Sequence, residues 1–140
     1  MADLQRAIEI AVSAHKGQQQ RNGFPYVLHP LKLMFAVSSV QAKIVAVLHD
    51  VVEDSTWELE DLRAEGFCES IIQAIDCLTH REGEEYEVYI ERVSGNDIAR
   101  EVKLADLTDN MNICRIPELK PKDLSRLERY HKAWLCLGGG

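Results

Sequence analysis

Residues 41–54, Gln-Ala-Lys-Ile-Val-Ala-Val-Leu-His-Asp-Val-Val-Glu-Asp, decide how this sequence folds. Most of these side chains are apolar, and a helix that is apolar all round belongs in the middle of a helical bundle. After Gln41 and Lys43 at its start, four polar residues interrupt the apolar run: His49 with Asp50, followed by Glu53 with Asp54. A buried imidazole or carboxylate without a partner is costly, so this segment predicts that its polar groups meet partners from elsewhere in the chain.

Helical periodicity extends over nearly the whole sequence. Apolar residues recur at three- and four-residue steps, and no alternating run bounded by turns indicates a strand. We therefore predict an all-α fold, a bundle of roughly six to eight helices. The expected helical segments are residues 3–16, 30–37, 41–52, a short helix capped by Ser55 or Thr56 and ending near Gly66, then 71–78, 84–93, 97–113, and a last helix from about Pro121.

Length and composition predict one domain. The chain has 140 residues, so we expect a single domain over residues 1–137 and a flexible glycine tail at residues 138–140. A formal charge of −7 disfavours binding to a nucleic-acid polymer, which requires a basic face. No apolar stretch approaches the ~20 residues that span a bilayer, and the N-terminus does not resemble a signal peptide. These features predict a cytoplasmic protein without a membrane partner, whose helices offer surfaces for a homodimer.

Two further polar residues complete a candidate metal site with the His49-Asp50 pair. Asp106 is an acid in the middle of an apolar-periodic helix, and His29 directly precedes a proline that can open a helix. Two imidazoles and two carboxylates leave positions for water and substrate on an octahedral ion. That ligand mixture suits Mn²⁺ or Fe²⁺ first, and Zn²⁺ or Mg²⁺ after them.

Each of these residues also has an ordinary structural interpretation. A His-Asp dipeptide is common by chance, Asp106 could pair with Lys103 one turn before it, and His29 could cap a backbone group. All of these would have to hold together on helices that are otherwise apolar, which favours the metal site. We expect Asp109 to be solvated rather than to support the site.

The same residues predict hydrolytic chemistry. A divalent metal acidifies water and offsets the charge of a phosphate. Glu53, one helical turn beyond His49, is placed to accept a proton from that water. Lys103 or Arg21 could neutralise the charge that develops on a phosphoryl group.

The order of these residues resembles the H…HD…D motif of the HD superfamily of metal-dependent phosphohydrolases. More specifically, Ala14-His15-Lys16-Gly17-Gln18 and Gly23-Phe24-Pro25-Tyr26-Val27-Leu28-His29-Pro30 resemble the start of the hydrolase domain of Rel/SpoT alarmone enzymes and of stand-alone small alarmone hydrolases. The segments Leu48-His49-Asp50-Val51-Val52-Glu53-Asp54 and Lys103-Leu104-Ala105-Asp106 with Asn110 resemble two further motifs of these enzymes.

This resemblance implies an all-helical HD domain that binds one Mn²⁺ and removes the 3′-pyrophosphate from (p)ppGpp. The implied metal ligands are His29, His49, Asp50 and Asp106. Glu53 and Asp54 match the pair that positions or activates the attacking water. Lys103, Asn110 and Tyr26 match positions near the nucleotide.

The chain departs from the alarmone hydrolases at two places. Gln20-Arg21 stands where they usually have Arg-Lys, whose arginine stacks on guanine, and Leu107-Thr108-Asp109-Asn110 replaces Arg-Leu-His-Asn. Three functions therefore stay open. The leading one is a (p)ppGpp 3′-pyrophosphohydrolase, the second is hydrolysis of another nucleotide or phosphorylated metabolite, and the third is a non-catalytic metal-binding HD sensor domain.

Overall fold

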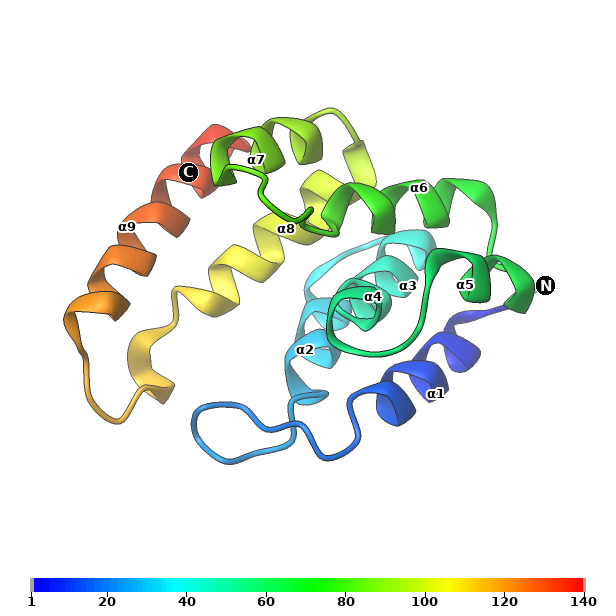
Figure 1. Cartoon of the computed structure of the whole chain (residues 1–140), viewed down its shortest axis with the longest axis horizontal. Helices are drawn as coiled ribbons and strands as arrows, with labels where there is room; N and C mark the ends of the chain where they lie inside the picture. Colours follow the sequence, from blue (N-terminus) through cyan, green and yellow to red (C-terminus); the bar gives the residue numbers. More distant parts are fainter. Residues whose placement is uncertain (1, 140) are drawn as a thin grey trace.

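The computed structural model describes residues 2–139, and within them the chain is all-α, as the sequence predicts. Figure 1 shows the helices arranged around α3, which packs against α1, α2, α6 and α8. The helical segments are α1 (Leu4–Ala14), α2 (Leu28–Ala36), α3 (Val40–Leu48), α4 (Val51–Asp54), α5 (Leu59–Glu65), α6 (Glu69–Leu78), α7 (Tyr86–Ser94), α8 (Asp97–Asn110), the 3₁₀ turn η1 (Ile113–Arg115) and α9 (Pro121–Cys136).

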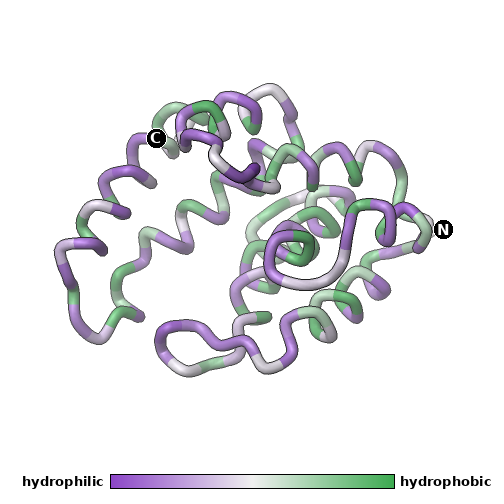
Figure 2. The backbone as a smooth tube through the Cα atoms, in the orientation of Figure 1, coloured by the Kyte–Doolittle hydropathy of each residue, from purple (hydrophilic) through white to green (hydrophobic). Residues whose placement is uncertain are grey.

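The central position of α3 follows from its composition. Every residue from Ile44 to Leu48 is buried, and Figure 2 shows hydrophobic residues concentrated in this part of the chain. Its one lysine is accommodated by the end of α2, because Lys43 Nζ donates hydrogen bonds to the carbonyl oxygens of Met34 and Val37. A cation at a helix C-terminus satisfies carbonyl groups that have no partner within the helix. The apolar segment therefore forms the core, as expected.

The predicted helix over residues 41–52 is wrong in one respect, because it is interrupted. Helix α3 ends at Leu48, and the four-residue α4 begins only at Val51, so His49 and Asp50 occupy the junction. Both junction residues keep αR backbone angles, but Asp50, with φ of −101° and ψ of −3°, departs from regular helical values. The side chains of His49 and Asp50, which would diverge on a continuous helix, can therefore point towards the same site.

Helix starts and stops agree with the sequence at several points. The Asn96 side chain accepts a hydrogen bond from the Ala99 N–H and so caps the start of α8. Pro121 is the first residue of α9. Gly66 ends α5 in the left-handed conformation with φ of 100°, where a side chain would be strained. The predicted cap at Ser55 or Thr56 is wrong, because Glu58 occupies that position.

The far end of the bundle is formed by α9, which packs mainly on α8. Gly138 and Gly139 donate backbone hydrogen bonds to the carbonyls of Leu135 and Trp134. Gly140 and Met1 lie outside the described residues, so the boundaries of the domain and the flexibility of the tail stay predictions. Among the described helices, none is long and apolar enough to cross a membrane.

Candidate metal centre

The structure brings the four predicted metal ligands together from three parts of the chain. His29 lies in the first turn of α2, His49 and Asp50 form the junction between α3 and α4, and Asp106 lies within α8. His29, His49 and Asp50 each offer one ligand atom, and these atoms lie within 4.8 Å of one another. Asp106 Oδ1 lies 2.8 Å from His29 Nε2 and 3.7 Å from His49 Nε2. Their role as metal ligands stays a prediction, but they form one cluster.

The cluster is positioned by helices that the core holds in place. Pro30, in the first turn of α2, costs no helical hydrogen bond there, and it directly follows His29. Helices α2, α3 and α8 pack against one another in all three pairs. His29, His49 and Asp106 are consequently buried, with exposed fractions of 4%, 3% and 6%.

His49 provides a test of whether these residues fit a cation. Its Nδ1 lies 2.6 Å from the carbonyl oxygen of Ala46, which can only accept, so Nδ1 carries the proton. Its Nε2 is buried and makes no hydrogen bond, although Asp50 Oδ2 lies 2.9 Å away. In a neutral ring, that nitrogen would direct its lone pair at a carboxylate. A cation between the two would satisfy both, so the donor set fits a divalent metal such as Mn²⁺, Fe²⁺ or Zn²⁺.

The electrostatics of the cluster favour positive charge at its centre. Burial lowers the pKa of His49, but the charge of Asp50 and contacts with Asp106 outweigh it, and the net pKa lies well above the usual value. The pKa of His29 is raised as well, because hydrogen bonds to Asp106 and Asp109 outweigh its burial. Burial also opposes ionisation of Asp106, yet Lys103 and the two histidines hold its pKa well below the ordinary value.

Three residues predicted to contact substrate lie around the cluster and bond to its acids. The hydroxyl of Tyr26 donates to Asp50 Oδ2 at 2.5 Å. Lys103 Nζ donates to Asp106 Oδ2 at 2.9 Å, and Asn110 Nδ2 donates to Asp106 Oδ1 at 3.0 Å. Lys103 therefore neutralises Asp106 here, as the structural interpretation of the sequence allowed. Contact of these residues with a substrate stays a prediction.

The two predicted catalytic acids lie on α4 beside the cluster. Glu53 lines a hollow of about 460 Å³ together with Lys103 and Tyr89. Its Oε1 accepts a hydrogen bond from the backbone N–H of His80 at 2.5 Å, which fixes the carboxylate. Desolvation raises the pKa of Glu53, and the negative charges of Asp50 and Asp54 add to this effect. A carboxylate with a raised pKa is a better proton acceptor.

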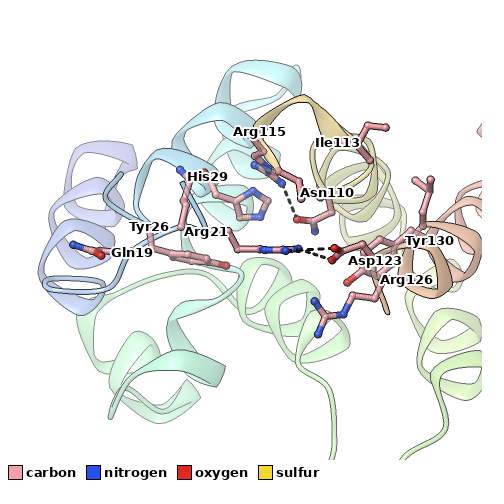
Figure 3. A pocket seen from close by; sticks show the side chains of 13 residues that line it. Gln19, Arg21, Tyr26, His29, Asn110, Ile113, Arg115, Asp123, Arg126 and Tyr130 are labelled. Carbon is pink, nitrogen blue, oxygen red and sulfur yellow. Dashed lines mark hydrogen bonds and ion pairs between the residues drawn. The ribbon is translucent and has the colours of Figure 1, made fainter. Parts of the chain in front are cut away.

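A second pocket, of about 240 Å³, is lined by His29 and shares Asn110 and Tyr130 with the hollow beside Glu53 (Figure 3). Arg21 enters it from the loop before α2, and Asp123 and Arg126 enter it from α9. Arg21 Nη1 donates to Asp123 Oδ1 at 2.5 Å, and this hydrogen bond lowers the pKa of Asp123 to about 2. The predicted substrate residue Arg21 thus lies apart from the metal cluster, but in a pocket that reaches it. Gln20 and Tyr26 line the same pocket.

Sequence reasoning missed two residues at this site. Asp109, expected to be solvated, lies with Oδ2 2.5 Å from His29 Nδ1. Arg115 of η1 donates to the same Oδ2 at 3.0 Å, and also to Asn110 Oδ1 at 3.2 Å. A signal for Asp109 existed, because residues three apart on a helix share a face and Asp106 is three residues earlier. No sequence signal marked Arg115.

No protein-family model matches the chain. A guanosine-3′,5′-bis(diphosphate) 3′-pyrophosphohydrolase from Borreliella burgdorferi is 38% identical over 78 residues, which cover 53% of this chain and 12% of that protein. A probable GTP pyrophosphokinase from Mycobacterium leprae is 32% identical over an alignment of 143 residues, covering 90% of this chain and 17% of that protein. The chain thus spans less than a fifth of the length of these two relatives.

A solved structure, described as a metazoan orthologue of SpoT that hydrolyses ppGpp and plays a role in starvation responses, has the same fold. Its TM-score is 0.81 at 21% identity, over 98% of this chain and 85% of that one. The chain resembles the Rel/SpoT alarmone enzymes. The Rel/SpoT resemblance found in the motifs is therefore confirmed by curated relatives, and the predicted all-helical fold by the solved structure.

Proposed function

We propose that this chain is a metal-dependent phosphohydrolase that removes the 3′-pyrophosphate from (p)ppGpp. The observation that carries the proposal is the cluster of His29, His49, Asp50 and Asp106, whose His29 lines one pocket and whose partner Lys103 lines a second hollow together with Glu53. We further propose Mn²⁺ as the metal, because two imidazoles and two carboxylates suit it. The relatives named as 3′-pyrophosphohydrolases support the substrate.

The metal would acidify water and offset the charge of the phosphate. Glu53 takes the proton of the attacking water, and Asp54 beside it orients that water. The water oxygen bonds to the phosphorus attached to the 3′ oxygen, and the bond from that phosphorus to the 3′ oxygen breaks. The 3′ oxygen keeps the electron pair of that bond and takes a proton to become the 3′ hydroxyl of the nucleotide, and pyrophosphate is released with the oxygen of the water. Lys103 is held between Asp106 and the Tyr89 ring, within the hollow that Glu53 also lines, where its charge meets the phosphoryl group.

One observation favours a second candidate within the same reaction class. Gln20 lines the pocket next to His29, and its uncharged amide lies 3.4 Å from the Pro25 carbonyl oxygen. Because the alarmone hydrolases that the motifs resemble usually have an arginine at this position, a different nucleotide or phosphorylated metabolite is the alternative substrate. Some relatives are named as GTP pyrophosphokinases, but the cluster and Glu53 are suited to activating water, which supports hydrolysis.

An activity screen separates these candidates. The purified protein, loaded with Mn²⁺, is incubated with ppGpp, with GTP and GDP, and with simple phosphomonoesters, and the released pyrophosphate and phosphate are measured. We expect pyrophosphate and GDP from ppGpp, at a rate that falls to background when the metal is removed by a chelator. Turnover of another compound beside none of ppGpp would establish the alternative substrate.

A further inference from the structure

Asp109 connects the metal cluster to the part of the pocket formed after α8. Its side chain is 11% exposed, and its Oδ2 lies 2.5 Å from His29 Nδ1. The opposite ring nitrogen of His29, Nε2, faces Asp106 Oδ1 at 2.8 Å and Asp50 Oδ2 at 4.0 Å. The two nitrogens of the His29 ring therefore face different acids. Nε2 faces Asp106 and Asp50 inside the cluster, and Nδ1 faces Asp109 outside it.

The acid outside the cluster can only stabilise one form of the ring. An ionised carboxylate has no proton to donate, so Asp109 bonds to His29 when Nδ1 carries a proton. That tautomer leaves Nε2 with its lone pair, directed at the other members of the cluster. Histidines that bind metals usually donate the other ring N–H to such a partner, which fixes both the tautomer and the orientation of the ring.

Two cationic side chains, those of Arg115 and Lys32, lie close to Asp109. Arg115 Nη1 donates to Asp109 Oδ2 at 3.0 Å, and Arg115 Nη2 donates to the Asp109 backbone oxygen at 2.9 Å. Lys32 Nζ of α2 lies 3.8 Å from the other carboxylate oxygen. Arg115 therefore fixes the direction of the Asp109 carboxylate, and Lys32 lies at ion-pair distance from its other oxygen. The guanidinium of Arg115 also contacts Asn110 and lines the same pocket as His29 (Figure 3).

We infer that Asp109 is the positioning residue for His29 and that Arg115 holds it in place. Asp109 accepts the Nδ1 proton of His29, so that Nε2 is the nitrogen presented to the metal. This inference rests on the metal centre of the proposed function, but it does not depend on the substrate. It also assigns Arg115 to both the metal cluster and the pocket, so a ligand that draws Arg115 away would loosen His29.

The test measures metal binding without any substrate. The dissociation constant of Mn²⁺ is determined by calorimetry for the wild type, Asp109→Leu and Asp109→Asn, with Asp97→Asn as the matched control. Asp97 lies on the same helix, is 94% exposed and pairs only with Arg100 among the described residues. We expect Asp109→Leu to weaken Mn²⁺ binding about 10- to 100-fold, as for loss of other partners of metal-binding histidines. Asp109→Asn keeps an acceptor oxygen and should lose less, and Asp97→Asn should match the wild type.

A second measurement reports the tautomer directly. In long-range ¹H–¹⁵N spectra of the Zn²⁺-loaded wild type, His29 should show a protonated Nδ1. A His29 bound through Nδ1, or an Asp109→Leu protein that binds Mn²⁺ as tightly as the wild type, would overturn the inference. If Asp109→Leu does not fold by circular dichroism, Asp109→Asn and the spectra decide. A wild type that binds Mn²⁺ but hydrolyses no ppGpp contradicts the proposed substrate alone.

Discussion

The phenol of Tyr26 donates a hydrogen bond to the carboxylate of Asp50, across 2.5 Å. This contact joins the loop before α2 to the junction between α3 and α4, so Tyr26 supports the cluster as well as lining the adjoining pocket. Burial raises the pKa of the Tyr26 hydroxyl, and the charge of Asp50 raises it further, so the group stays a donor. A donor outside the cluster fixes the orientation of the Asp50 carboxylate, whose Oδ2 also faces His49 Nε2 at 2.9 Å.

Replacing Tyr26 by Phe should therefore lower Mn²⁺ affinity by about tenfold, because Asp50 loses its only side-chain donor outside the histidines among the described residues. Calorimetry with Mn²⁺ measures this, and Tyr130→Phe, on the opposite wall of the pocket, serves as the control. A Tyr26→Phe protein with unchanged Mn²⁺ affinity but a raised KM would show that Tyr26 acts on the substrate instead.

Glu53→Gln should separate catalysis from metal binding. The amide cannot take a proton from water, so kcat for the substrate that the wild-type protein hydrolyses should fall by at least about 100-fold. Mn²⁺ affinity should stay within about twofold of the wild type, because Glu53 lies outside the cluster. The control is Glu87→Gln, an exposed acid on α7. Retained turnover in Glu53→Gln would remove Glu53 from the proposed mechanism.

Acid should weaken the stabilisation that Mn²⁺ provides. His29 and His49 have raised pKa values in the metal-free protein. A raised pKa stabilises the folded state fully below the unfolded value of about 6.5, and this contribution disappears as pH rises through the folded pKa. Metal binding needs the same imidazoles without those protons. The protons and the metal therefore compete for the cluster.

Melting temperatures with and without Mn²⁺, between about pH 5.5 and 8.5, measure this competition around the ordinary histidine pKa. The increase in Tm caused by Mn²⁺ should grow as pH rises. An increase that is constant over this range would show that the two histidines do not exchange protons for metal.

Arg21→Met should loosen α9. The side chain of Asp123 is buried, and its ion pair with Arg21 connects α9 to the loop before α2. Amide hydrogen exchange in the first turns of α9 should accelerate, whereas exchange in α1 should not change. Arg81→Met, which removes an exposed ion pair with Asp76, is the control. Equal exchange of α9 in both variants would mean that its packing on α8 alone holds it.

The sequence predicted the helices best where local signals act alone. Asn96 and Pro121 mark helix starts through capping and a fixed φ angle, and both positions agree with the structure. The break at His49 and Asp50 was not predictable, because Val51 continues the apolar helical pattern and both junction residues keep helical backbone angles.

The candidate site shows the same limit. Asp106 could be singled out because it is an acid within an apolar pattern, and His29 because it directly precedes a proline that can open a helix. Their mutual distance, and the contact of Asp109 with His29, depend on how α2 packs on α8, which no local pattern encodes. The pairing of Arg21 with Asp123, 102 residues apart, is equally invisible to local reasoning.

That pairing has a consequence for the order in which the protein is assembled during synthesis. All four residues of the metal cluster precede residue 107, so a nascent chain that has emerged through α8 already contains them. The pocket beside the cluster needs Asp123, Arg126 and Tyr130, which leave the ribosome later. A nascent chain that has emerged only through α8 therefore carries the cluster residues but not the last wall of the pocket. Until α9 is made, Arg21 has no Asp123 to hold it.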